Sequence, residues 1–136
     1  MAKVFLDSNI FLYAIGAEGP HRAPCREILA AAGAGQIHAV TSSEVLQEIL
    51  HVRSRRAGSS DASRAVHAAA GMVAEVFPVS GADVMRAGVL LQGHRAMSAR
   101  DAIHVAVMQG NHVSTIVSLD HDFDGISGIR RVGPSL

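Results

Sequence analysis

The sequence is poor in several features on which whole classes of protein depend. Cys25 is the only cysteine, which excludes an intrachain disulfide and a zinc site built on thiolates. Tryptophan is absent and 4% of the residues are aromatic, so platforms for stacking bases are scarce. Acidic and basic residues balance at a formal net charge of zero, which excludes a strongly basic nucleic-acid binder. No apolar run approaches the roughly 18 residues of a membrane span.

What the sequence does contain is typical of one globular domain. Its 136 residues are 49% apolar and 18% charged, which is too apolar for a disordered chain and close to the usual size of a domain. No repeat or linker interrupts it, so we expect a single domain over residues 1–136. The first apolar run stops at Asp7, unlike that of a signal peptide. We therefore expect a cytoplasmic protein that does not contact membranes.

Short β-branched runs alternate with longer Ala- and Leu-rich segments of helical period. The predicted strands occupy residues 4–6, 37–40, 75–79, 115–118 and 129–132, the last at an edge. The predicted helices occupy residues 8–14, 20–33, 42–56, 61–74, 82–92 and 98–110. Strands separated by helices need crossover connections, which produce parallel pairing. The pattern predicts an α/β fold, a three-layer α/β/α sandwich with a mostly parallel central sheet of four to five strands.

Acidic residues lie at the ends of the predicted strands. Asp7 directly follows the first strand, and Glu44 stands at the start of the helix after the second. Asp101 lies in the first turn of the 98–110 helix, and Asp120, with Asp122 close behind, follows the fourth strand. Ligands in such folds bind beyond the carboxyl ends of the strands, so these carboxylates are expected to meet and repel one another there. Mg²⁺ or Mn²⁺ with oxygen ligands relieves this repulsion.

Each acid also has a structural interpretation that the sequence leaves open. Residues 41–44 and 98–101 both match a capping box, in which the acid closes the start of a helix. Asp120 and Asp122 suit an ordinary turn. Asp7 has no helix period to satisfy and no obvious cationic partner, so it is the strongest candidate for a ligand. The two roles are compatible, because a helix N-terminus also stabilises a carboxylate.

Two other motifs are weaker. Residues 120–125 reproduce the first half of an EF-hand calcium loop, but its twelfth position is Arg131 instead of glutamate. Residues 4–9 resemble the strand-end Asp-x-Asp of haloacid-dehalogenase phosphatases, but the second aspartate is replaced by Asn9. Lys3 is the only lysine and precedes the strand, so no lysine motif accompanies it. A calcium loop and a metal-dependent phosphatase are therefore minor alternatives.

Four segments, in chain order, resemble the signatures of PIN-domain ribonucleases, above all those of VapC toxins from toxin–antitoxin modules. They are Phe-Leu-Asp-Ser-Asn-Ile at 5–10, Thr-Ser-Ser-Glu-Val at 41–45, Ser-Ala-Arg-Asp-Ala-Ile-His-Val-Ala at 98–106, and Ile-Val-Ser-Leu-Asp-His-Asp-Phe at 116–123. The resemblance covers nearly the whole chain, and the last two segments are its most specific parts. Residues 58–93 match in pattern alone.

The resemblance implies a Mg²⁺- or Mn²⁺-dependent endoribonuclease that uses one or two ions and leaves 5′-phosphate and 3′-hydroxyl ends. It assigns the catalytic acids to Asp7, Glu44, Asp101 and Asp120, with Asp122 as the alternative to Asp120. Asp7, Asp101 and Asp120 would bind the metal, and Glu44 would bind it through water or orient the attacking water. The resemblance also implies a homodimer, inhibited by a cognate VapB-type antitoxin in a heterotetramer or larger complex.

Other polar residues are expected to support this site. Ser8 and Ser118 lie next to the acids and are expected to orient the carboxylates from outside the ligand set. RNA phosphates need positive charge around an anionic cleft, and the candidates are Arg53, Arg55, Arg56, Arg95 and Arg100. The cluster at 53–56 equally suits a solvated helix C-terminus. His104, one turn after Asp101, either reaches the cleft or is a structural histidine.

Interaction surfaces and rival functions complete the expectations. The helices around residues 11–15, 28–29 and 45–50 hold more apolar side chains than one small core needs, so part of this surface is expected to bind an antitoxin helix. A patch near 82–92 is expected to contribute to the homodimer. The rivals are a catalytically inactive PIN-like interaction module, whose acids only cap helices, and a DNA nuclease, which the short chain disfavours.

Overall fold

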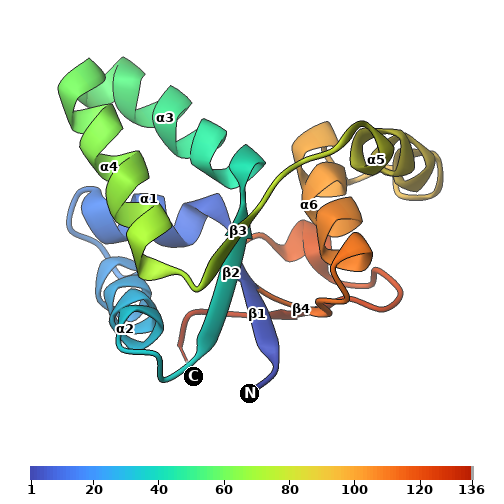
Figure 1. Cartoon of the computed structure of the whole chain (residues 1–136), viewed down its shortest axis with the longest axis horizontal. Helices are drawn as coiled ribbons and strands as arrows, with labels where there is room; N and C mark the ends of the chain where they lie inside the picture. Colours follow the sequence, from blue (N-terminus) through green and yellow to red (C-terminus); the bar gives the residue numbers. More distant parts are fainter. Residues whose placement is uncertain (136) are drawn as a thin grey trace.

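The computed structural model describes residues 1–135 and contains a five-stranded sheet with helices on both faces (Figure 1). In chain order the elements are β1 (Lys3–Leu6), α1 (Ser8–Ile15), α2 (Arg22–Gly33), β2 (His38–Ser42), α3 (Ser43–Ala57), α4 (Ser59–Met72), β3 (Glu75–Phe77), α5 (Gly81–Gly93), α6 (Ala99–Gly110), β4 (Thr115–Val117), the 3₁₀ turn η1 (His121–Phe123) and β5 (Arg130–Val132). No helix in this part of the chain is long and apolar enough to cross a membrane.

The strands lie in the order β3–β2–β1–β4–β5, and every neighbouring pair is parallel. From β1 the chain first crosses to β2 and β3, and then returns past β1 to β4. Because such crossovers are right-handed, the two directions place their helices on opposite faces of the sheet. Figure 1 shows α1 to α4 on one side and α5 and α6 on the other. The predicted three-layer α/β/α fold is confirmed.

The change of direction creates a switch point between the neighbouring strands β1 and β4. Leu6 pairs with Val117 at the end of both strands. Ligands in open parallel sheets bind beyond the carboxyl ends of the strands at such a point. Asp7 is the residue after β1 and Ser118 the residue after β4. The topology therefore brings the first and the last of the predicted acidic segments to one edge.

The central strands are buried on both faces. Phe5, Leu6, Val40 and Ile116 have no exposed surface. Burial on two sides explains why these strands read as short continuous apolar runs instead of alternating patterns. Ile10, Val45, Ile49 and Val105 extend the core from the helices. The edge that carries the acids thus stands on a rigid, fully packed base.

The start of α3 differs from its prediction. Ser42 caps this helix, because its Oγ accepts from the Val45 N–H at 3.4 Å. Thr41 still belongs to β2, and its hydroxyl donates to the Leu6 carbonyl at 2.9 Å. The strand runs two residues further than predicted, so Glu44 is the second residue of α3, one position short of a capping box. The predicted capping box at 41–44 is therefore wrong.

The link between α3 and α4 is also tighter than predicted. Gly58 alone turns the chain, with a φ of 90° that residues bearing a side chain rarely adopt. α4 therefore begins at Ser59, ahead of the predicted cap at Asp61. Asp61 lies in the first turn of α4 and accepts from Arg53 Nε at 2.9 Å. This ion pair joins the last part of α3 to the start of α4.

Candidate active site

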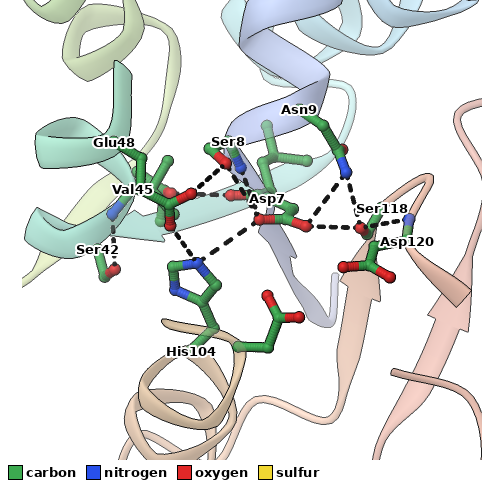
Figure 2. A network of polar contacts seen from close by, with 12 residues as sticks. Asp7, Ser8, Asn9, Ser42, Val45, Glu48, His104, Ser118 and Asp120 are labelled. Carbon is green, nitrogen blue, oxygen red and sulfur yellow. Dashed lines mark hydrogen bonds and ion pairs between the residues drawn. The ribbon is translucent and has the colours of Figure 1, made fainter. Parts of the chain in front are cut away.

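Asp7 caps α1 at the point where β1 ends, and hydrogen bonds fix its carboxylate (Figure 2). Oδ1 accepts from the Ser8 N–H at 2.8 Å, and Oδ2 accepts from Ser118 Oγ at 2.6 Å and from Asn9 Nδ2 at 3.4 Å. The residue is only 4% exposed. Burial raises the pKa of Asp7, although the proximity of His104 and the bond from Ser118 oppose the rise. A buried carboxylate held by several donors has a fixed orientation, unlike that of an ordinary turn residue.

Asp101 lies in the first turn of α6, and its carboxylate is not used for capping. Ser98 caps the helix by accepting from the Asp101 N–H at 3.1 Å, as predicted. In α5, by comparison, the Ser80 N–H also donates to the Asp83 carboxylate at 2.9 Å, which completes a capping box. No such return contact is found for Asp101 within residues 1–135. Its carboxylate is therefore available to the cleft.

Asp120 and Asp122 lie in the loop after β4. The Asp120 N–H donates to Ser118 Oγ at 3.0 Å, and Asp120 Oδ1 accepts from the Asp122 N–H at 2.9 Å, which starts the 3₁₀ turn η1. One carboxylate oxygen each of Asp101, Asp120 and Asp122 lie within 4.8 Å of one another. The structure therefore brings together both candidates for the acid after β4.

The close approach of these carboxylates shifts the pKa of Asp101. Burial, followed by the negative charges of Asp120 and Asp7, raises the pKa of Asp101 to about 7, and a hydrogen bond with Asp120 acts in the same direction. A proton or a divalent cation relieves such repulsion. The donor set consists of hard oxygen ligands that are only partly buried. It fits a cation such as Mg²⁺ or Mn²⁺ that keeps part of its water shell.

Glu48, one helical turn after Glu44, occupies the place expected of Glu44. Glu48 Oε2 accepts from Ser8 Oγ at 3.0 Å, and its Oε1 lies 2.7 Å from His104 Nε2. Glu44 makes no side-chain hydrogen bond or ion pair within the described chain. Residues four apart share a helix face, so the sequence pattern is compatible with either glutamate. Because β2 extends to Ser42, Glu44 lies at the start of α3, and Glu48 is the glutamate of α3 that contacts Ser8 and His104.

His104 is fully buried between Glu48 and Asp7 (Figure 2). Its Nε2 lies 2.7 Å from Glu48 Oε1 and 3.6 Å from Asp7 Oδ1, and its ring packs against Phe5 with centroids 5.6 Å apart. Burial disfavours the charged ring, but the bond with Glu48 and the charges of Asp7 and Glu48 raise the pKa of His104. His104 lies three residues after Asp101, which places both side chains on the same face of α6, toward the cleft. No pattern in the sequence indicates that its partner on α3 is Glu48.

Ser8 and Ser118 lie where the sequence predicted, and each joins two acids. Ser8 Oγ donates to Glu48 at 3.0 Å, while its backbone N–H binds Asp7. Ser118 Oγ donates to Asp7 and accepts from the Asp120 N–H. Asn9, which the sequence analysis did not select, donates to Ser118 Oγ at 3.2 Å. These neutral side chains fix the distances between carboxylates that would otherwise move apart.

The five predicted RNA-binding arginines differ in their availability. Arg53 is engaged by Asp61 at 2.9 Å, and its side chain is 17% exposed. Three others are exposed: Arg55, Arg56 and Arg95. Arg100 is exposed at the start of α6, and its charge helps to lower the pKa of Glu48 against the effect of burial. Arg100 is therefore the predicted arginine that the structure places beside the acids.

Arg131 positions the loop that follows β4. Its NH1 donates to the Ser118 carbonyl at 2.9 Å, and its Nε donates to Asp124 Oδ1 at 2.8 Å. Asp124 would be the third ligand position of the EF-hand alternative, and here it is engaged by the arginine at the twelfth position. The calcium-loop interpretation is therefore wrong. In the sequence Arg131 stands out only as a mismatch to the calcium loop, and no pattern there indicates that it holds the loop after β4.

Comparison with known proteins agrees with this geometry. A family model described as the PIN domain matches residues 4–129. Ribonuclease VapC13 of Mycobacterium tuberculosis is 38% identical over 133 residues, which cover 95% of this chain and 98% of the relative. Ribonuclease VapC23 of the same species is 37% identical over 120 residues, which cover 87% and 93%.

Solved structures show the same fold. VapC20 of Mycobacterium tuberculosis, a toxin that cleaves the sarcin–ricin loop, has a TM-score of 0.75 at 23% identity, with 93% of this chain and 98% of that chain covered. VapBC2 of Rickettsia felis, bound to a DNA fragment from its promoter, has a TM-score of 0.74 at 18% identity, with 96% and 98% covered. The chain belongs to the PIN-domain family, among the VapC ribonucleases.

Proposed function

We propose that this protein is a Mg²⁺- or Mn²⁺-dependent endoribonuclease and the toxin of a type II module with a VapB-type antitoxin. The observation that carries the proposal is the meeting of Asp101, Asp120 and Asp122, with ligand oxygens within 4.8 Å, next to Asp7 at the switch point. The VapC relatives support RNA as the substrate. An RNA substrate and a single free cysteine support a cytoplasmic location.

Each residue of the cleft has a distinct role in this proposal. Asp101, Asp120 and Asp122 would hold the cation, with Asp7 completing the set from β1. When bound, the cation supplies Lewis acidity toward a phosphate oxygen and makes a coordinated water more acidic. Ser118 fixes the distance between Asp7, which follows β1, and Asp120, which follows β4, because it bonds to the Asp7 carboxylate and to the Asp120 N–H.

The test of the proposed function is RNA cleavage with and without a divalent cation. We expect the protein in EDTA to be inactive on a single-stranded RNA oligonucleotide, and cleavage to return with Mg²⁺ or Mn²⁺. A DNA oligonucleotide of the same sequence is the matched substrate and is expected to stay intact. Cleavage of the DNA would favour the DNA nuclease, turnover of a phosphomonoester alone would indicate the phosphatase, and inactivity throughout would indicate the interaction module.

Arg100→Ala is expected to weaken RNA binding, because this exposed arginine lies beside the acids where the phosphate backbone would approach. The slope of log affinity against log salt concentration should fall by about one for each lost phosphate contact. Binding is measured by fluorescence anisotropy in EDTA, where RNA is not cleaved. An unchanged slope would contradict the assignment.

Arg53→Ala is the matched control for this measurement. Arg53 pairs with Asp61, so its loss should act on stability, by about 1 kcal/mol or less, and leave the salt dependence of RNA binding unchanged.

Only part of the apolar segments that were expected to bind an antitoxin helix is exposed. The apolar residues of the predicted segments that belong to the core are Phe11, Ala14, Ile28, Leu29, Val45 and Ile49. Tyr13, Ile15 and Leu50 remain 43–47% exposed on α1 and α3. Tyr13 also lines a cavity of about 540 Å³ between α1, the loop after it and α3. We place the antitoxin helix on this remaining apolar surface.

α5 presents the surface proposed for the homodimer. Val84, Met85 and Val89 are 50%, 72% and 67% exposed on this helix. We expect a dimer in sedimentation velocity at micromolar concentration, and a monomer for Met85→Asp, because a charge in an apolar interface is costly to bury. Gln47→Asp, on the exposed face of α3, is the matched control and should leave the dimer intact. A monomeric wild-type protein would contradict this proposal.

A further inference from the structure

His104 and Glu48 form a closed pair at the inner end of the cleft. Both oxygens of Glu48 are engaged: Oε1 lies 2.7 Å from His104 Nε2, and Oε2 accepts from Ser8 Oγ at 3.0 Å. The His104 side chain has no exposed surface, and that of Glu48 is 14% exposed. The pair is therefore a fixed part of the protein interior, with no solvated carboxylate oxygen that is free to bind a ligand.

The imidazole of His104 occupies the space between Glu48 and Asp7. A cation bridging these two carboxylates would lie about 2.0–2.6 Å from an oxygen of each. His104 Nε2 lies 2.7 Å from Glu48 Oε1 and 3.6 Å from Asp7 Oδ1, so the ring stands between the two oxygens that such a cation would join.

The two oxygens of Asp7 face different surroundings. Oδ1 points toward His104, whereas Oδ2 accepts from Ser118 Oγ, which also binds the Asp120 N–H. Through Ser118, Oδ2 is joined to the loop after β4, which carries Asp120 and Asp122. Asp7 thus belongs with Asp101, Asp120 and Asp122, which we call the outer acids, and the ring of His104 lies between Asp7 and Glu48.

The second ring nitrogen of His104, Nδ1, bears on the role of this residue. Nδ1 is buried and has no hydrogen-bond partner within residues 1–135. Buried polar atoms are normally paired, and an apolar side chain would fill the same space without leaving an atom unpaired. The position therefore favours histidine for its Nε2 contacts and not for packing alone.

We propose that His104 is a positioning residue that takes the place of a second metal ion, so that the cleft binds one divalent cation through the outer acids. Glu48 then holds His104 and is not a metal ligand. This inference rests on the proposed function, which supplies the metal site. It adds that the site binds one ion and that Glu48 is not one of its ligands.

The test is the number of Mn²⁺ ions bound per chain, measured by calorimetric titration and by electron paramagnetic resonance of free Mn²⁺. Wild-type protein is expected to bind one ion. Asp101→Asn should weaken binding by more than about 100-fold, and Glu48→Gln by about 10- to 100-fold, since loss of a residue that only supports the ligands costs less than loss of a ligand.

Variants of His104 give the sharper comparison. His104→Ala removes the ring between Glu48 and Asp7, and a second Mn²⁺ is expected to bind in the space it leaves. His104→Gln keeps an amide donor toward Glu48 and should bind one ion, as wild type does. If His104→Ala does not fold, the wild-type stoichiometry and Glu48→Gln still decide the question.

The outcomes separate this inference from the proposed function. Two ions bound to an RNA-cleaving wild-type protein, or equal losses of affinity in Glu48→Gln and Asp101→Asn, would overturn the role of His104 alone. A wild-type protein that neither binds Mn²⁺ nor cleaves RNA would overturn both.

Discussion

Asp7→Asn is expected to abolish RNA cleavage while the protein stays folded. The substitution removes one negative charge from the acidic cleft without changing the size of the side chain. Electrostatic stabilisation by a bound cation contributes several kcal/mol to such a reaction, and every 1.36 kcal/mol is a factor of ten in rate. A ligand position that no longer carries charge should therefore reduce the rate by at least about 100-fold.

The fold should tolerate this change because burial already disfavours the charge. Burial raises the pKa of Asp7, so a neutral side chain removes a cost. The asparagine carbonyl still accepts from the Ser8 N–H, whereas the bond that Ser118 Oγ donates to Oδ2 is lost, because an amide nitrogen does not accept. The bond from Asn9 at 3.4 Å is lost for the same reason.

Glu75→Gln is the matched control for Asp7→Asn. Glu75 opens β3 at the opposite edge of the sheet and pairs with Lys3 at 3.7 Å on the surface. This variant should cleave RNA at the wild-type rate. Cleavage is measured on the same RNA oligonucleotide in Mg²⁺, and circular dichroism checks the fold. A folded Asp7→Asn protein that cleaves RNA at the wild-type rate would overturn the site.

The acids that follow strands were predictable because strand ends are set by local pattern. Asp7 stands where a buried apolar run stops, and a parallel sheet collects all such positions at one edge. The same reasoning located Asp120 and Asp122. It did not need to know how the helices pack, since the sheet alone defines the edge.

The glutamates of α3 were not predictable in this way. Glu44 and Glu48 lie on one face of α3, and only the packing of α3 against α1 and α6 decides which one meets Ser8 and His104. α3 is capped by Ser42 and not by the predicted Thr41, because the Thr41 hydroxyl bonds to the Leu6 carbonyl on the neighbouring strand, 35 residues away in sequence. Both features come from tertiary contacts that local pattern does not contain.

Without a divalent cation, the protein is expected to lose stability as the pH rises from 5 to 8. Asp101 has a pKa of about 7 in the folded protein, against an ordinary value of 3.8. The folded state therefore binds this proton more tightly than the unfolded chain does. Its contribution to stability is fully present below pH 3.8 and is lost as the pH rises through about 7.

The other shifted groups of the cleft do not reverse this trend. The pKa values of Asp7 and His104 are also raised, so their contributions fall with increasing pH as well. The pKa of Glu48 is lowered from 4.5, so its contribution is present above that value and is lost only in more acidic solution. The sum is a melting temperature in EDTA that falls across the neutral range.

A divalent cation should restore the stability, and more strongly at pH 8 than at pH 5. Metal ions bind the deprotonated carboxylates, so binding competes with protons. At a hundredfold excess over the Kd, binding adds about 2.7 kcal/mol, or roughly 10 °C in melting temperature for a chain of this size. Melting is followed by circular dichroism between pH 5 and 8, in EDTA and in Mg²⁺.

Asp101→Asn tests whether the pH dependence of the melting temperature comes from the crowded carboxylates. With no charge at this position, the variant in EDTA should melt higher than wild type at pH 8, while the two converge at pH 5. Its response to Mg²⁺ should be largely lost. Glu75→Gln, far from the cleft, should follow the wild-type curves. A wild-type melting temperature in EDTA that rises from pH 5 to 8 would mean that the four carboxylates do not share one cleft.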